Sequence, residues 1–463
     1  MRLMDLAALS PFVLASCGGD AFMEASSIND SGADVASDAG MDAEAATSDG
    51  WPTLDSNADH DAVIDGDANP FADAGDASES GPVTPPAPVA QFYSDAACPF
   101  PASISYDAPT NTLLMACGAN GSQPNGLFRS QPLGQGNTWT LVGQAKGYPS
   151  YHIALNDSYY LITHSAPHGF SIIDGKTGIT TGSVDFSAIS PLDPLYAQIK
   201  SNINSPAGAV LVGGQICVAT SNLDQIDPND PSSTTFHQGS VICMPYNYDG
   251  TVSVAYATAL LTSGLNPTAM ALIDSDPVSV EGGSIQRFAV LSSNSYANDP
   301  ADDAKLDVID INSGSMNSIT LGKVTAQTTP ALAMTEDGAS FIVGVQKPSS
   351  QFLGVNWSDG NISYPPVQLV TNGYVYGASV FGKLALVTDS GVFGDPSRNG
   401  ALFISNVDPA GWQGTLVTKM PGLVGAGVAV NGKYYATVTV PENSDAGNDK
   451  KGEIYVTDLG GLQ

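Results

Sequence analysis

From residue 89 onward, short apolar runs alternate with clusters of small or polar residues along the chain. The apolar runs are rich in Val, Ile, Tyr and Phe, and Gly, Pro, Asn and Asp separate them. β-Branched and aromatic residues favour strands, and the separating residues favour turns. Apolar residues at helical spacing are almost absent. The pattern therefore predicts an all-β fold for residues 89–463.

A ten-residue phrase recurs in this region and divides it into units. Five copies carry a proline at or near the start, as in NPTAMALIDS, and the last two copies lack it. The starts of successive copies are 45 to 63 residues apart, which predicts seven units. The copies occupy residues 100–109, 148–157, 205–214, 266–275, 329–338, 374–383 and 423–432.

Each unit continues with further strand-like runs. A second run ends in Thr, Ser or Asn (216–222), a third follows a loop (170–174), and a fourth often closes the unit (318–322). Repeated units of four antiparallel strands are typical of a β-propeller, whose blades pack face to face around an axis. The seventh unit supplies only three strands. Residues 88–94 are predicted to provide its outer strand and close the ring; the alternative is that they belong to the preceding linker.

One unit also resembles a known repeat. Residues 306–345, LDVIDINSGSMNSITLG followed by TPALAMTEDGASFIVGV, resemble the YVTN-type repeat, with a Val-Ile-Asp strand and a turn at Glu336-Asp337-Gly338. The other units match less closely, and the fourth contains an insertion at residues 274–286. The resemblance implies a propeller fold. It implies no catalytic residues, because such propellers mostly bind other molecules and share no catalytic motif.

The N-terminus predicts export. Leu14–Cys17, with the sequence LASC, resembles the bacterial lipobox, and the apolar stretch Leu6 to Ala15 is too short to span a bilayer. The resemblance implies that residues 1–16 are a signal peptide, that Cys17 carries the lipid, and that Gly18 directs the protein to the outer membrane. A lipid-anchored protein of the bacterial outer membrane, on the periplasmic or surface side, is expected. The alternative is an ordinary secretory signal with a chance cysteine.

Charge separates the next segment from the rest. The chain has 463 residues and a formal charge of −31, and residues 18–88 hold 13 Asp and 3 Glu with no Lys or Arg. Such a segment buries too little apolar area to offset its ordering entropy, so residues 17–88 are predicted to be a disordered tether. The strongly acidic balance excludes nucleic acid as a partner.

Four further cysteines test the arrangement of strands. Cys98 precedes the first inner strand and Cys117 ends the returning strand, while Cys217 and Cys243 lie on consecutive antiparallel strands. Disulfides form in exported proteins. The local pairs Cys98–Cys117 and Cys217–Cys243 are predicted, with free buried thiols as the alternative.

The connections between second and third strands are long, and the turns between third and fourth strands are mostly short. In a propeller the former emerge at one end, here named the long-loop face, and the latter at the other, the short-turn face. Long loops on a rigid scaffold usually mark an interaction surface, although they also occur as solvated spacers. The candidate binding residues on the long-loop face are Tyr151, His152, His164, His168, Asp227, Asp230, Asp299, Asp302, Asp303, Asp395 and Arg398.

Metal sites are weak candidates in this sequence. The carboxylates of Asp299, Asp302 and Asp303 suit Ca²⁺, which takes six to eight oxygen ligands, but they lack EF-hand spacing. His152, His164 and His168 would share one face of the second blade and approach one another as metal ligands. We expect no required cofactor, with Ca²⁺ as the one possible addition.

Enzyme motifs are mostly missing. The chain contains no G-x-S-x-G, H-E-x-x-H, C-x-x-C, P-loop or G-x-G-x-x-G, and residues 129–139 only faintly resemble the Asp box of sialidases because the Asp is absent. A binding or scaffolding module for an envelope protein or polysaccharide is the preferred function. The alternative is a propeller enzyme, lactonase- or glycan-hydrolase-like, acting on a small sugar-derived substrate.

Overall fold

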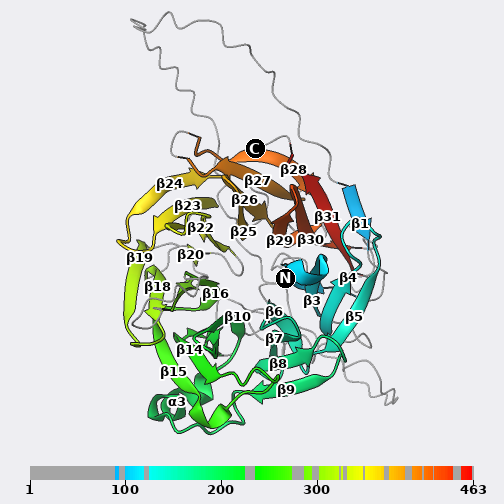
Figure 1. Cartoon of the computed structure of the whole chain (residues 1–463). Coiled ribbons are helices and arrows are strands. Elements are labelled where there is room, and N and C mark those ends of the chain that lie inside the picture. The colour runs from blue at the N-terminus through cyan, green and yellow to red at the C-terminus, as the bar shows by residue number, and fades with distance from the viewer. Residues whose placement is uncertain are drawn as a thin grey trace, which may run out of the picture. The chain divides into compact units, whose positions relative to one another are not determined.

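Among the residues it describes, the computed structural model contains seven blade sheets arranged in a ring, six with four strands and one with five (Figure 1). One blade has its inner strand in two pieces. The model therefore confirms the predicted all-β, seven-bladed β-propeller. The structure describes residues 89–92, 98, 100–118, 125–224, 235–273, 286–294, 302–322, 325–326, 331–347, 350–369, 375–391, 399–408, 411–420, 422–441 and 450–460. The predicted signal peptide, Cys17 and the acidic segment lie outside these residues.

Blades 1 to 4 have their strands in chain order from the axis outward. Blade 1 consists of β2 (Phe100–Asp107), β3 (Thr112–Gly118), β4 (Gly126–Ser130) and β5 (Trp139–Gln144). Blade 2 consists of β6 (Tyr148–Ala154), β7 (Tyr159–Ser165), β8 (Gly169–Asp174) and β9 (Thr180–Asp185). Blade 3 consists of β10 (Pro206–Val212), β11 (Gln215–Thr220), β14 (Gln238–Pro245) and β15 (Thr258–Leu265). Blade 4 consists of β16 (Pro267–Leu272), β17 (Arg287–Ser292), β18 (Ala304–Asp310) and β19 (Met316–Gly322).

Blades 5 to 7 complete the ring. Blade 5 consists of β20 (Thr325–Ala326) and β21 (Leu332–Met334), which both pair with β22 (Ser340–Lys347), then β23 (Gln351–Asn356) and β24 (Ile362–Gln368). Blade 6 consists of β25 (Val375–Phe381), β26 (Leu384–Asp389), β27 (Gly400–Asn406) and β28 (Thr415–Met420). Blade 7 consists of β29 (Leu423–Val430), β30 (Lys433–Pro441), β31 (Lys450–Asp458) and β1 (Val89–Phe92).

The two ends of the propeller meet in blade 7. β1 pairs antiparallel with β31, in a register that places Val89 opposite Val456 and Phe92 opposite Glu453. β1 is therefore the outer strand of the seventh blade, as the sequence predicted for residues 88–94, and Figure 1 shows it beside β31. This pairing removes one exposed sheet edge and closes the ring with hydrogen bonds.

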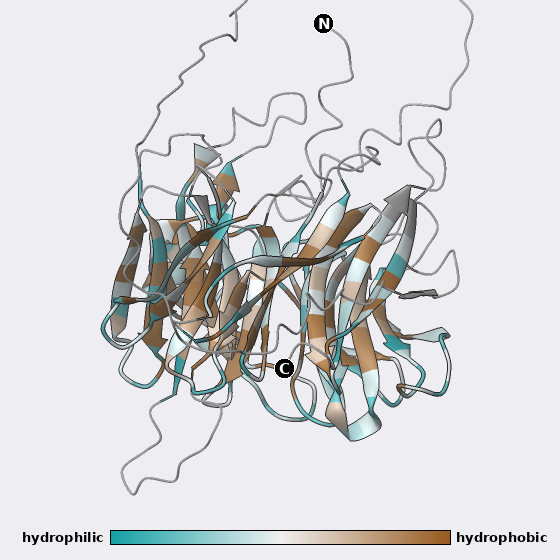
Figure 2. Ribbon diagram, turned by 90° about the horizontal axis from the view of Figure 1, so that it is seen from above, coloured by the Kyte–Doolittle hydropathy of each residue, from teal (hydrophilic) through white to brown (hydrophobic). Residues whose placement is uncertain are grey.

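The apolar core is divided among the seven contacts between neighbouring blades. Each contact contains its own cluster of buried side chains; the cluster between blades 2 and 3, for example, includes Ile172 and Val218. In Figure 2, apolar and polar positions alternate along many of the strands. A sheet covered on both faces by neighbours needs apolar residues at consecutive positions, which is why the second strands contain few polar residues.

Two elements depart from the simple repeat. Helix α3 (Pro194–Ile199) lies in the connection from β9 to β10, where Asp193 accepts a hydrogen bond from the backbone of Leu195 and caps the helix. The strands β12 (Leu223–Asp224) and β13 (Thr235–Phe236) form a small hairpin on the long-loop face of blade 3. Short 3-10 turns occupy Ala108–Thr110, Lys200–Asn202 and Val254–Tyr256. No helix among the described residues is long and apolar enough to cross a bilayer.

Both predicted cysteine pairs are confirmed. The sulfur atoms of Cys98 and Cys117 lie at disulfide distance, with Cα atoms 5.4 Å apart, and those of Cys217 and Cys243 do the same, with Cα atoms 4.0 Å apart. Cys217 faces Cys243 directly in the register of β11 and β14. Two disulfides are typical of a protein that folds in an oxidising compartment outside the cytoplasm.

Candidate functional site

The long-loop face is built from the ends of second strands. β3, β11, β17, β26 and β30 each end there, and a long connection leads back to the third strand of the same blade. The sheets are antiparallel, so all these connections leave the ring at the same end. The structure thus supports the predicted clustering of long connections at one face, although most of their residues lie outside those described.

Backbone turns at this face are fixed by residues in the left-handed region. Asn222 and Asn294 follow second strands with φ of 54° and 72°, while Ser205 and Asn266 precede inner strands with φ of 52° each. Asn tolerates this conformation better than most residues. The Asn266 carbonyl also accepts a hydrogen bond from the backbone N–H of Ser293.

Hydroxyl groups tie successive blades together near the same end. Ser150 donates to the carbonyl of Pro206 at 2.7 Å and Ser221 donates to that of Pro267 at 2.8 Å. Thr388 donates to the carbonyl of Gly425 at 3.0 Å. Each bond runs from one blade to the inner strand of the next. The long connections therefore start from a scaffold that both packing and hydrogen bonds hold in place.

Aromatic side chains gather where the inner strands begin. The rings of Phe100 and Tyr148 lie 6.3 Å apart, and Tyr376 packs against Leu423. Burial and, second, the electrostatic interaction with Tyr376 raise the pKa of Tyr148. Blades 2 and 6 are not neighbours, so this interaction crosses the axis. The half-buried Tyr148 and the buried Tyr376 are neutral phenols, which suit packing and hydrogen bonding rather than acid–base catalysis.

The predicted histidine cluster on the long-loop face is not what the structure shows. His152 is 2% exposed and lies between the hydroxyls of Ser103 and Ser105, inside the contact between blades 1 and 2. His164 is fully buried, with Nδ1 2.8 Å from the carbonyl of Pro167. Burial lowers the pKa of both imidazoles.

The other two candidates of blade 2 also have local roles. His168 accepts a hydrogen bond from the backbone N–H of Ser205 at 3.2 Å, and Tyr151 packs against the core between blades 2 and 3. Burial raises the pKa of Tyr151. Tyr151 and His168 thus help to hold blades 2 and 3 together. Burial removes His152 and His164 from the predicted binding surface, whereas binding by the half-buried Tyr151 and His168 stays a prediction.

The acidic candidates are only partly described. Asp302 is exposed and Asp303 half-buried at the start of β18, and the backbone carbonyl of Asp302 accepts a hydrogen bond from the side chain of Asn294. Asp227, Asp230, Asp299, Asp395 and Arg398 lie outside the described residues. Among the residues that the structure does describe, no three His, Cys, Asp or Glu side chains gather as metal ligands. The binding role of these carboxylates remains a prediction.

Arg129 and Arg287, the two arginines of the propeller among the described residues, both contact other side chains of the fold. The guanidinium of Arg287 lies 4.4 Å from the centroid of the Trp357 ring, at the start of a second strand as the sequence indicated. Arg129 donates to the Tyr160 hydroxyl at 2.5 Å and lies 3.5 Å from the carboxylate of Asp107. These two arginines therefore do not form an anion-binding group at the axis.

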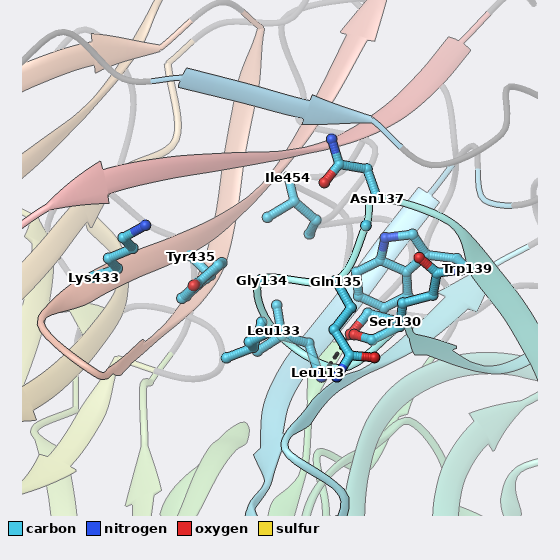
Figure 3. Close-up of a pocket in the computed structure, with 12 residues that line it drawn as sticks. Leu113, Ser130, Leu133, Gly134, Gln135, Asn137, Trp139, Lys433, Tyr435 and Ile454 are labelled. Atoms are coloured by element: carbon cyan, nitrogen blue, oxygen red, sulfur yellow. Dashed lines mark hydrogen bonds between the residues drawn. The ribbon is translucent and has the colours of Figure 1, made fainter.

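A pocket of about 400 Å³ lies at the contact between blades 7 and 1, toward the short-turn face (Figure 3). Sequence analysis missed it because its walls come from residues some 300 positions apart, near Trp139 and near Tyr435. The sequence signal for it is weak: residues 131–138 form a glycine-containing turn on the short-turn face, but the connections from β14 to β15 and from β27 to β28 are as long or longer.

Comparisons with known proteins give structural similarities and no sequence match. No protein-family model matches the chain, and no curated protein sequence matches it significantly. Among solved structures, the chain is similar to the Dos1 propeller, with 9% identity and a TM-score of 0.49, over 81% of this chain and 96% of that chain. It is similar to BamB from Moraxella catarrhalis, with 13% identity and a TM-score of 0.41, over 81% and 99%. A gluconolactonase from Xanthomonas campestris has 8% identity and a TM-score of 0.41, over 79% and 88%. The chain is a seven-bladed β-propeller on the evidence of its own sheets.

Proposed function

We propose that this protein is a bacterial outer-membrane lipoprotein with YVTN-like repeats, whose propeller serves as a binding or scaffolding module for an envelope protein or polysaccharide. Cys17 carries the lipid and the acidic segment up to residue 88 acts as the tether. The long-loop face contacts the partner. No cofactor is required for such a role.

The observation that carries the proposal is the construction of the long-loop face. Its long connections start from strand ends that are fixed between blades by hydroxyl–carbonyl hydrogen bonds. The axial end beside them contains Tyr148 and Tyr376, which are neutral phenols whose pKa values burial raises further above the physiological range. A rigid frame with extended loops suits recognition of a partner surface, whereas catalysis needs convergent acid–base groups.

Site-specific photo-crosslinking in intact cells tests the binding role. A photoreactive residue at Asp302, which is exposed at the base of a long connection, is compared with one at Asn312, which is exposed in a turn of the same blade at the opposite end. We expect a specific envelope partner to be captured from position 302 and much less from position 312. Capture of no specific neighbour, together with turnover of a panel of sugar lactones, would favour the enzyme alternative.

Membrane anchoring is tested independently of the partner. We expect metabolically supplied palmitate to label the wild-type chain and the protein to fractionate with outer membranes. Cys17→Ser removes the thiol that would carry the diacylglyceryl group, so label and membrane association should both be lost. Unchanged membrane association of the Cys17→Ser protein would contradict the anchor while leaving the propeller argument intact.

A further inference from the structure

The pocket between blades 7 and 1, here named the seam pocket, has a floor of core side chains. Leu113, Tyr435 and Ile454 line it and are 2%, 5% and 2% exposed. All three belong to the apolar cluster that joins the first and last blades, and the half-buried Trp139 packs against the same cluster. The volume of about 400 Å³ lies within the range of about 300–1,000 Å³ found for small-ligand sites.

One wall is a turn that its own backbone hydrogen bonds hold in shape. Gln131 N–H donates to the carbonyl of Thr138 at 3.0 Å across the base of the turn. Leu133 N–H donates to the carbonyl of Asn111 at 2.8 Å, which joins the turn to the neighbouring one of the same blade. Gly134, with a φ of 87°, allows the sharp reversal between them. The wall is therefore preformed, which reduces the entropy lost when a ligand binds.

Polar groups on the pocket lining are left without protein partners. Within the described part of the chain, the side-chain amides of Gln135 and Asn137 and the hydroxyl of Tyr435 form no hydrogen bond. Both amides lie on the preformed turn and are solvent-exposed, while the Tyr435 ring is almost fully buried. An amide both donates and accepts, and so does a phenol. The pocket thus offers several hydrogen-bonding groups next to aromatic surface (Figure 3).

Charge on the lining is low for so acidic a chain. The formal charge of the protein is −31, yet among the described residues that line the pocket there is no Asp or Glu, and Lys433 is the one charged side chain. Lys433 is exposed and lies opposite Asp458 in the register of β30 and β31, so the rim is close to neutral. This balance favours a neutral polar ligand over an anion or a cation.

We propose that the seam pocket binds one neutral pyranose unit of a saccharide. The ring of Trp139 packs against the C–H face of the sugar, and Gln135, Asn137 and the Tyr435 hydroxyl exchange hydrogen bonds with its hydroxyl groups. The pocket lies at the opposite end of the ring from the long-loop face. The inference therefore goes beyond the proposed function, and either one can fail without the other.

Saturation-transfer NMR on the full chain tests the proposal. The probes are the methyl β-glycosides of glucose, galactose and N-acetylglucosamine, with glucuronate as the charged comparison. We expect at least one neutral glycoside to bind with millimolar affinity. Gln135→Ala combined with Asn137→Ala should weaken it tenfold or more, and neither exposed change is expected to disturb folding. Trp139→Ala should abolish binding and Trp139→Phe should restore part of it, because a ring face is retained.

Matched controls use the outer hairpin of blade 4 and another partly buried tryptophan. Asn312→Ala combined with Asn317→Ala alters two exposed amide side chains there, and Trp357→Ala removes a ring far from the seam pocket. Binding should be unchanged in both. Absence of saturation transfer to every neutral glycoside, tenfold preference for glucuronate, or equal losses in the control variants would each overturn the proposal.

Discussion

His152 makes the stability of the propeller depend on pH in a way that can be worked out from the structure. The imidazole is 2% exposed, with Nδ1 2.6 Å from the Ser103 hydroxyl and Nε2 2.7 Å from the Ser105 hydroxyl. A neutral ring satisfies both contacts, since one nitrogen donates and the other accepts. Burial lowers the pKa of His152 from its ordinary 6.5 to about 3.

The sign of the effect follows from proton linkage. Between pH 6.5 and about 3, the unfolded chain binds a proton at His152 and the folded chain does not. The stabilising contribution of neutral His152 is therefore complete above pH 6.5 and is lost as pH falls toward 3. Each pH unit in this window is equivalent to about 1.4 kcal/mol, so a change from neutral pH to about pH 4.5 removes about 3 kcal/mol from the free energy of unfolding.

Urea unfolding of the wild type and of His152→Gln, at about pH 7.5 and about pH 4.5, measures this contribution. Glutamine keeps a donor and an acceptor near the two serines but does not titrate. We expect the wild type to lose about 3 kcal/mol more than the variant between the two pH values, because the pH effects of all other groups, His164 included, cancel in the difference. Parallel losses in the two proteins would refute the assignment of His152 as a buried neutral imidazole.

Three other expectations concern the ring itself. Replacing Cys217 and Cys243 together by Ala should lower the free energy of unfolding by about 3 kcal/mol, as expected for a disulfide that closes a loop of 26 residues, and the urea midpoint measures the loss. A chain that starts after Phe92 lacks the outer strand of blade 7 and should melt at a lower temperature than a chain that starts at Val89; equal melting temperatures would contradict closure by that strand. Ser221→Ala removes a buried 2.8 Å hydrogen bond to the next blade and should cost about 1 kcal/mol in urea unfolding.

Local sequence patterns predicted the strands well because the repeat constrains them. The phrase starting at residue 148 begins at the first residue of β6, and the phrase starting at residue 423 begins at the first residue of β29. Proline is the first or second residue of the inner strand in blades 1 to 4, so comparison among units averages out local ambiguity. Blade 5 is the exception, since its phrase at residues 329–338 contains only the short strand β21.

The orientation of side chains was harder to predict, and the inner strands show why. In six blades the register shifts near the start of the inner strand, as between Pro149 and Tyr151 in blade 2. A shift of one residue reverses which face each following side chain occupies. The sequence places His152 where the chain enters an inner strand at the long-loop face, but its side chain lies between blades 1 and 2. Helix α3 was missed for a different reason: six residues are too few to show a helical period.

The contact between blades 7 and 1 differs from the other blade contacts because it joins the two ends of the propeller. No single repeat therefore contains all the residues that form it. Its core includes Cys98, which precedes the first inner strand, and Ile454, which lies opposite Gln91 of the closing strand. At the short-turn face of this contact the side chains leave a space between the first and last blades. The long turn at residues 131–138 covers part of the gap, and the space that remains is the seam pocket. The walls of this pocket come from the first and last blades, so no single repeat encodes it.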